Sequence, residues 1–246
     1  MRIWLVPSAF YPSQGGVEEL TLQLAQQYQL QGHDVRVVVH RHPADLPARA
    51  VVEGVEVHRV GFDLPGSRVG SLLTYPVSLA RQVRALAALG ERPDVVHVQC
   101  AANQVPAVAA HCVLRKTPLV MTTQGEVTMD ANQIYHHSFQ MRTALRVGAR
   151  AAAALTACSR RAGDDAAAVA EPFRDCAVIP NGVDPSQWKV TPLPDDPVYA
   201  AWGRHVPQKG FDLLIQAFAL LRQKLPAARL LLGGSGPDSD RLKALA

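Results

Sequence analysis

The sequence predicts an α/β fold, in which a doubly wound parallel sheet carries helices on both faces and is followed by the opening of a second, incomplete unit of the same kind. Two observations lead to this prediction. Short apolar runs alternate with amphipathic stretches along the 246 residues, as strands and helices do in parallel-sheet proteins. The alternation is interrupted by a proline-rich stretch and then starts again.

The first unit contains a regular series of predicted elements. Ile3–Val6 predicts a buried strand, and the helix that follows it ends at Gly32. The strand at residues 55–60 alternates apolar and polar side chains, which indicates a place near an edge of the sheet. Further strands are expected at residues 35–39, 94–98, 119–122, 154–157 and 176–179, and further helices at 75–89, 105–114, 138–152 and 160–169.

The prolines divide the chain. We expect a first domain at residues 1–184, a linker at 185–197 and an incomplete second domain at 198–246. The second domain shows two strands, at 198–202 and 230–232, with one complete helix between them. Parallel strands need cover on both faces, so we expect a stable core at 1–190 and poor packing after about Pro197.

Composition favours a cytoplasmic protein. The net charge is +4, and no apolar run reaches the roughly 20 residues that span a bilayer. The N-terminus lacks the pattern of a signal peptide. The four cysteines have no metal-binding spacing and no HExxH motif is present, so we expect no metal site. We expect no cofactor either.

Gly15 and Gly16 lie between the first strand and the first helix. Glycines at this place let the backbone approach a ligand, and a helix N-terminus offers free N–H groups to a phosphate. A tight turn without a ligand explains the same pair. The GxGxxG pattern of dinucleotide-binding proteins is absent.

The second domain repeats this arrangement with charge added. Arg204 and Lys209 lie in a loop between a strand and a helix, where two cations can bind a diphosphate. Gly234, in the Gly-Gly-Ser-Gly run at 233–236, follows the next strand and allows another close approach. A solvated basic loop and a plain turn are the alternatives.

Three arginines are spaced by four residues on one predicted helix. Arg142, Arg146 and Arg150 fall in a stretch from residue 131 to 163 that has no acidic residue. They form either a solvated face or a patch that contacts an anionic lipid or acceptor. Nucleic acid is a less suitable partner, because no aromatic residues are interleaved with the arginines.

Five motifs in this order resemble the family 4 retaining glycosyltransferases. They are Gly-Gly-Val-Glu at 15–18, Thr-Gln-Gly-Glu at 123–126, Pro-Asn-Gly-Val-Asp at 180–184, Gly-Arg-(x4)-Lys-Gly at 203–210 and the Gly-Gly-Ser-Gly run. The resemblance implies the GT-B architecture, with two Rossmann-like domains, and transfer of a sugar from a UDP- or GDP-sugar to a lipid or glycan acceptor. It implies retention of anomeric configuration, usually without a metal, and allows attachment to the inner face of a membrane.

The resemblance also assigns roles to residues. Gly15 and Gly16 would approach the donor phosphate, and Arg204 and Lys209 would neutralise the departing diphosphate. Gln124 and Glu126 would face the acceptor and the sugar from the loop at 123–130.

Two departures from the family pattern stand out. Gln124 occupies a position where many members have histidine, so it can donate or accept a hydrogen bond but cannot carry a proton near neutral pH. The family's glutamate-(x7)-glutamate element is missing, because no glutamate follows Glu171. We therefore expect the 246-residue chain alone to be inactive.

Two other interpretations stay open. The first is a truncated, non-catalytic remnant of such an enzyme. The second is another GT-B or Rossmann enzyme, such as a nucleotide-sugar epimerase. An NAD-dependent oxidoreductase is disfavoured by the missing GxGxxG pattern.

Overall fold

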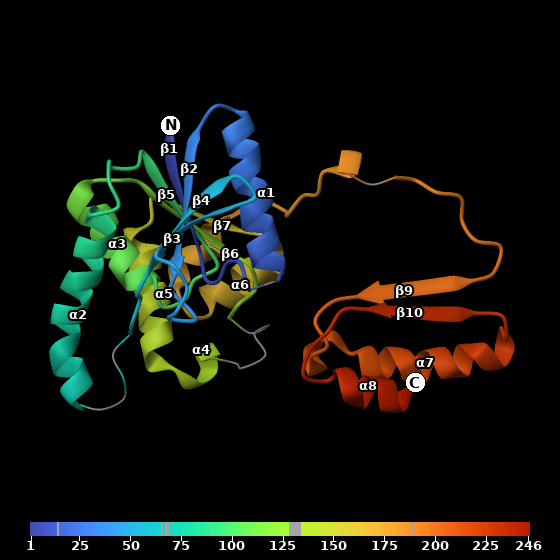
Figure 1. The fold of residues 1–246 in the computed structure, drawn as a ribbon. Helices are drawn as coiled ribbons and strands as arrows, with labels where there is room; N and C mark the ends of the chain where they lie inside the picture. Colours follow the sequence, from blue (N-terminus) through green and yellow to red (C-terminus); the bar gives the residue numbers. More distant parts are fainter. Residues whose placement is uncertain (14, 65, 67–68, 128–133, 188) are drawn as a thin grey trace. The chain divides into compact units, whose positions relative to one another are not determined.

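The computed structural model describes residues 1–13, 15–64, 66, 69–127, 134–187 and 189–246 (Figure 1). It divides into two compact units, Met1–Asn181 and Gly182–Ala246, which are described one at a time. This division falls three residues before the end expected for the first domain, and it groups the proline-rich segment with the second unit.

The first unit is built on an eight-stranded sheet in the order β3-β4-β2-β1-β5-β6-β7-β8. The strands are β1 (Arg2–Pro7), β2 (Asp34–His40), β3 (Arg49–Val52), β4 (Val55–Val60), β5 (Val95–Gln99), β6 (Leu119–Thr123), β7 (Ala154–Ala157) and β8 (Ala177–Val178). All neighbouring pairs are parallel except β3 and β4. In the central register, Leu5 lies opposite Val37 of β2 and His97 of β5. The order reverses at β1, whose two neighbours follow it on opposite sides, and such a switch point is where α/β proteins place ligands.

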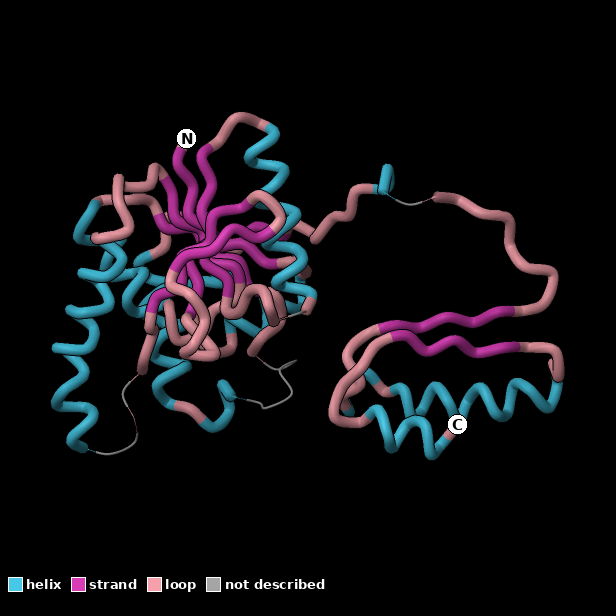
Figure 2. The backbone as a smooth tube through the Cα atoms, in the orientation of Figure 1, coloured by secondary structure: helices cyan, strands magenta, loops and turns pink. Residues whose placement is uncertain are grey.

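Helices cover both faces of this sheet, as the sequence predicts (Figure 2). Ile3 and Leu5 pack into one apolar core with Leu22 of the first helix, whereas Trp4 and Val6 point into the other core. This alternation follows from the two-residue period of a strand. The helices are α1 (Gly16–Leu30), α2 (Val69–Ala87), α3 (Val105–Arg115), α4 (Ile134–His137), α5 (Phe139–Ala151) and α6 (Arg160–Ala167).

Four elements differ from the expected ones. Strand β3 was not predicted; it pairs antiparallel with β4 through a turn in which Glu53 and Gly54 have φ of 46° and 82°. Helix α2 begins six residues before the expected start and holds Pro76 in its interior. Helix α4 and the 3-10 turn η1 (Glu171–Asp175) were not expected either.

The second unit contains a two-stranded parallel sheet, β9 (Val198–Trp202) and β10 (Arg229–Gly233). Helices α7 (Phe211–Lys224) and α8 (Ser239–Leu245) cover one face through Phe211, Ile215 and Leu242. Two 3-10 turns, η2 (Pro185–Gln187) and η3 (Pro207–Lys209), complete it. The strands also leave Trp202 and Leu231 75% and 50% exposed, so they are not covered on both faces by the described residues. The stability of this unit stays a prediction.

In the described part of the chain, no helix has the length and apolar composition needed to cross a membrane.

Candidate functional site

A network of polar side chains lies where β5, β6 and β7 approach their carboxyl ends. The imidazole of His97 contacts the Thr122 hydroxyl at 2.7 Å, and this hydroxyl contacts that of Thr156 at 2.6 Å. The Gln99 amide nitrogen reaches His97 Nε2 at 3.1 Å. Parallel strands bring such side chains together, because their carboxyl ends meet at one edge of the sheet.

Gln124 is held in place by two other amides. Its Nε2 donates to Gln99 Oε1 at 3.1 Å, and its Oε1 accepts from Asn181 Nδ2 at 2.9 Å. A primary amide has two N–H donors, so one N–H of Gln124 is not used by these two bonds. Within the described residues, the half-buried side chain therefore keeps one N–H that neither of these bonds occupies.

The carboxylate of Glu126 accepts three hydrogen bonds. They come from the Ala101 N–H at 2.8 Å, the Thr123 hydroxyl at 3.0 Å and the Gln124 N–H at 2.6 Å. Burial raises the pKa of Glu126, while these donors act in the opposite direction. The bonds tie the loop after β6 to the segment after β5, and the catalytic role of Glu126 stays a prediction. Residues 128–130 of the predicted acceptor loop lie outside the described residues.

His97 is neutral at physiological pH. Burial lowers its pKa from 6.5 to about 4, so the ring acts in the network as a neutral hydrogen-bonding group. Sequence reasoning did not single out His97, Gln99 or Asn181. Asn181 belongs to the Pro-Asn-Gly-Val-Asp motif at 180–184, but nothing in the spacing indicates that it bonds to a residue 57 positions away.

The Gly15–Gly16 turn opens α1, as predicted. Gly15 caps the helix in an extended conformation, and a Cβ on Gly15 would lie 2.6 Å from Glu18 Oε2. The Glu18 carboxylate also accepts a hydrogen bond from the Ser13 hydroxyl at 2.9 Å. Glu18 and Glu19 occupy the first turn of α1, so two carboxylates already face the positive end of its dipole. Gly16 has open space around its Cβ position, and its phosphate contact stays a prediction.

In the second unit, Arg204 and Lys209 lie on the loop that leads from β9 into α7. Both side chains are exposed, and within the described residues neither forms an ion pair with a carboxylate. Gly234 packs against this loop with a φ of 124°, and a Cβ there would overlap the carbonyl oxygen of Gly203. The glycine is thus required for backbone packing between the two loops, whether or not a phosphate also approaches it.

The arginine series lies on α5, as predicted, but its members are not equivalent. One nitrogen of Arg142 donates to the carbonyls of Tyr135 and His136, both at 2.8 Å. Arg146 Nε donates to the Val169 carbonyl at 2.8 Å. Arg150 is exposed. Two of the three guanidinium groups therefore bind the fold itself, and lipid contact by the series stays a prediction.

The two units are described separately, so the predicted approach of Arg204 and Lys209 to the Gly15–Gly16 turn also stays a prediction. Among the described residues, no group of three or more histidine, cysteine and acidic side chains could hold a metal ion.

Comparison with solved structures identifies the fold. The chain superimposes on Anabaena Alr3699/HepE in complex with UDP and glucose with a TM-score of 0.66, at 20% identity, covering 100% of this chain and 64% of the other. The catalytic domain of Starch Synthase IV from Arabidopsis thaliana, bound to ADP and acarbose, matches with a TM-score of 0.61 at 13% identity, covering 98% of this chain and 70% of the other. The fold is the GT-B fold, as the resemblance implied.

Family models identify the chain more closely. Residues 14–187 match Glycosyltransferase Family 4, and residues 184–246 match Glycosyl transferases group 1. The chain belongs to Glycosyltransferase Family 4.

Two characterised relatives cover the chain almost completely. A GDP-mannose:cellobiosyl-diphosphopolyprenol alpha-mannosyltransferase of Xanthomonas oryzae pv. oryzae is 31% identical over 262 residues, spanning 100% of this chain. A phosphatidyl-myo-inositol mannosyltransferase of Mycolicibacterium smegmatis is 27% identical over 257 residues, spanning 99% of this chain. The chain spans 64% and 61% of the length of these relatives.

Proposed function

We propose that the protein containing this chain transfers a sugar from a GDP- or UDP-sugar to a lipid-linked acceptor, with retention of anomeric configuration. The observation that carries the proposal is the pair of exposed cations, Arg204 and Lys209, before the N-terminus of α7. The relatives support the choice of substrates. The name of the Xanthomonas relative specifies GDP-mannose and cellobiosyl-diphosphopolyprenol, and that of the Mycolicibacterium relative specifies phosphatidyl-myo-inositol.

In this reaction, negative charge develops on the leaving diphosphate. The bond from the anomeric carbon to the diphosphate breaks, and a bond to the acceptor hydroxyl oxygen forms on the same face of the sugar. The hydroxyl proton passes to an oxygen of the departing diphosphate. Arg204, through its planar fork, and Lys209, as a point charge, stabilise the negative charge that builds there, and the N–H groups at the start of α7 add to this effect.

On the acceptor side, Gln124 acts as a hydrogen-bond donor. Its carbonyl is occupied by Asn181 and one of its N–H groups by Gln99, so the second N–H is directed to a sugar hydroxyl. Glu126 positions this side chain by holding the backbone N–H of Gln124. No side-chain base is required, because the diphosphate accepts the proton.

The test uses the longest polypeptide in which this chain occurs. Release of GDP or UDP is measured for a panel of nucleotide sugars, with a disaccharide on diphosphopolyprenol as acceptor. We expect turnover with a GDP-hexose and a product whose anomeric proton shows the configuration of the donor. Inversion, or transfer only to acceptors without a lipid, would contradict the proposal. No release with any donor would favour the non-catalytic remnant.

A further inference from the structure

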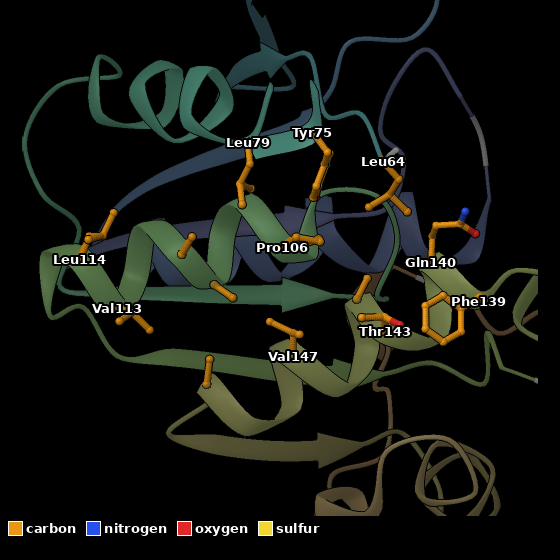
Figure 3. Close-up of a pocket in the computed structure, with 14 residues that line it drawn as sticks. Leu64, Tyr75, Leu79, Pro106, Val113, Leu114, Phe139, Gln140, Thr143 and Val147 are labelled. Atoms are coloured by element: carbon orange, nitrogen blue, oxygen red, sulfur yellow. The ribbon is translucent and has the colours of Figure 1, made fainter. Parts of the chain in front are cut away.

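We propose that an apolar groove between α2, α3 and α5 binds the prenyl chain of the acceptor lipid. The groove has a volume of about 740 Å³ (Figure 3). Twelve of its fourteen lining residues are apolar or aromatic, and the other two are Gln140 and Thr143. The inference deepens the proposed function and rests on it, because it identifies where that acceptor's hydrocarbon lies.

The groove has a polar end and an apolar end. In Figure 3, Phe139, Gln140 and Thr143 lie toward one end of the groove and Val113 and Leu114 toward the other. Helix α3 follows β5, so its first residues lie at the carboxyl edge of the sheet and its last residues at the opposite edge. The 11 residues of α3 extend about 16 Å, which sets the length of chain that the groove can hold.

The polar end adjoins the candidate acceptor site. Tyr135, on α4, donates from its hydroxyl to the Ala101 carbonyl at 2.9 Å. The N–H of the same Ala101 donates to Glu126, which holds Gln124. Phe139 begins α5, directly after α4. A lipid with its head group near Gln124 would therefore enter the groove at the Phe139 end.

The walls of the groove expose apolar side chains to solvent. Val113, Leu114 and Phe139 are 64%, 71% and 66% exposed. Contiguous apolar surface of this kind marks sites that bind proteins, membranes or apolar ligands.

The charge of the surrounding helices favours one of these kinds of ligand. Helices α2, α3 and α5 carry six arginines and no acidic residue, and the arginines are Arg81, Arg84, Arg115, Arg142, Arg146 and Arg150. The three helices that line the groove therefore carry only positive charges, and helices of this charge favour a lipid that carries phosphate groups. A second copy of the chain is disfavoured, because a two-fold contact across this face would oppose arginines to arginines.

The experiment is a calorimetric titration of the chain with geranyl, farnesyl and geranylgeranyl diphosphate, with inorganic diphosphate as the reference. We expect affinity to rise at least about tenfold from geranyl to farnesyl diphosphate, because each added methylene is buried, and then to level off when the groove is full. Prenyl binding should show a negative heat-capacity change that inorganic diphosphate lacks.

Two matched variants test where the prenyl chain binds. Ala110→Phe fills the groove from α3 and should remove the gain with chain length, whereas Val77→Phe adds the same ring at an α2 position that is 67% exposed and outside the lining. If Ala110→Phe does not fold, Val147→Asn makes the wall polar and should weaken farnesyl diphosphate by at least about fivefold.

Three outcomes would overturn the groove assignment. The first is an affinity for prenyl diphosphates that does not depend on chain length. The second is an equal loss of binding to phosphatidylglycerol vesicles in Ala110→Phe and Val77→Phe, which would indicate a flat membrane contact. The third is dimerisation of the protein that the groove variants abolish. The proposed function is tested separately with a soluble acceptor analogue. Transfer to this analogue, together with prenyl diphosphate binding that does not depend on chain length, would reject the groove alone. Prenyl diphosphate binding that depends on chain length, without release of nucleotide, would reject the proposed transfer alone.

Discussion

The two units differ in whether the polar side chains of the loops that follow their strands are bonded to the rest of the fold. In the first unit, Gln124 and Glu126 are bonded to neighbouring groups of the fold. In the second, Arg204 and Lys209 are exposed and, within the described residues, form no ion pair. The loop that carries them is fixed instead by backbone packing, since Gly234 lies against Gly203 and His205 N–H donates to the Ser235 carbonyl at 2.8 Å.

This difference matches two kinds of ligand. A neutral sugar hydroxyl is recognised by a donor whose direction is already fixed, so little ordering is left to the binding step. A diphosphate is recognised by charge, and cations without an internal carboxylate partner keep their attraction for it. The proposed function therefore predicts that the first unit orients the acceptor and that the second stabilises the charge of the diphosphate.

Removal of either donor-side cation is the strongest test of this contrast. In the longest polypeptide in which this chain occurs, Arg204→Ala and Lys209→Ala should each lower kcat/KM by about 10²–10³, as the loss of one preorganised charge-stabilising group does. Thermal unfolding should change little, because both side chains are exposed. Lys224→Ala, at an exposed cation in the last turn of α7, is the control and should leave turnover unchanged. A loss of stability equal to the loss of activity would show that the cations serve the fold.

Acid should weaken the first unit through His97. Its pKa is lowered from 6.5 to about 4, so the folded state disfavours the protonated ring. The stability that depends on neutral His97 is complete above pH 6.5 and is lost as pH falls toward 4, by about 3 kcal/mol at most. Urea unfolding at several pH values measures this. In His97→Gln, which cannot titrate, the slope should become smaller, and burial of His40 and His111, which also lowers their pKa values, should maintain the remainder. A slope equal to that of the unchanged protein would assign the acid effect to groups other than His97.

Glycine substitutions compare the two turns directly. Gly234→Ala places a methyl group against the Gly203 carbonyl at a φ of 124°, and we expect it to destabilise the second unit by about 2 kcal/mol. Gly16→Ala meets no atom within 4 Å and should change stability by less than about 0.5 kcal/mol. Hydrogen exchange of each unit separates the effects. Equal destabilisation by both would show that the two turns are built alike.

The sequence is sufficient to predict the helices and strands that depend mainly on residues close together along the chain. Apolar runs predicted seven strands of the first unit, and Gly32, with a φ of 81°, ends α1 as expected. Strand β3 was missed because Arg49–Val52 is short and depends on the turn at Glu53 and on pairing with β4.

The site was only partly predictable for a similar reason. Gln124 and Glu126 were identified from the loop motif, but their partners come from distant segments. Gln99 lies 25 residues from Gln124, and Ala101 lies 25 residues from Glu126. No local periodicity encodes such contacts. They form because the order of the parallel sheet brings the carboxyl ends of β5, β6 and β8 to the same side of the sheet. The arginine spacing likewise predicted one helix face but not that Arg142 and Arg146 bind carbonyl groups.

The smallest expected effects separate the arginines of α5 into structural and surface residues. Arg142→Gln should destabilise the first unit by about 1 kcal/mol, because the carbonyls of Tyr135 and His136 lose a charged donor. Arg150→Gln should leave thermal unfolding unchanged, since the side chain is exposed. Binding to anionic vesicles at low salt should show the reverse order, with the larger loss for Arg150→Gln, because a guanidinium held by carbonyls is less free to reach lipid phosphates. If the two variants weaken vesicle binding equally while only Arg142→Gln lowers stability, then the charge of the whole face attracts the lipid. If neither changes binding, α5 presents a solvated face.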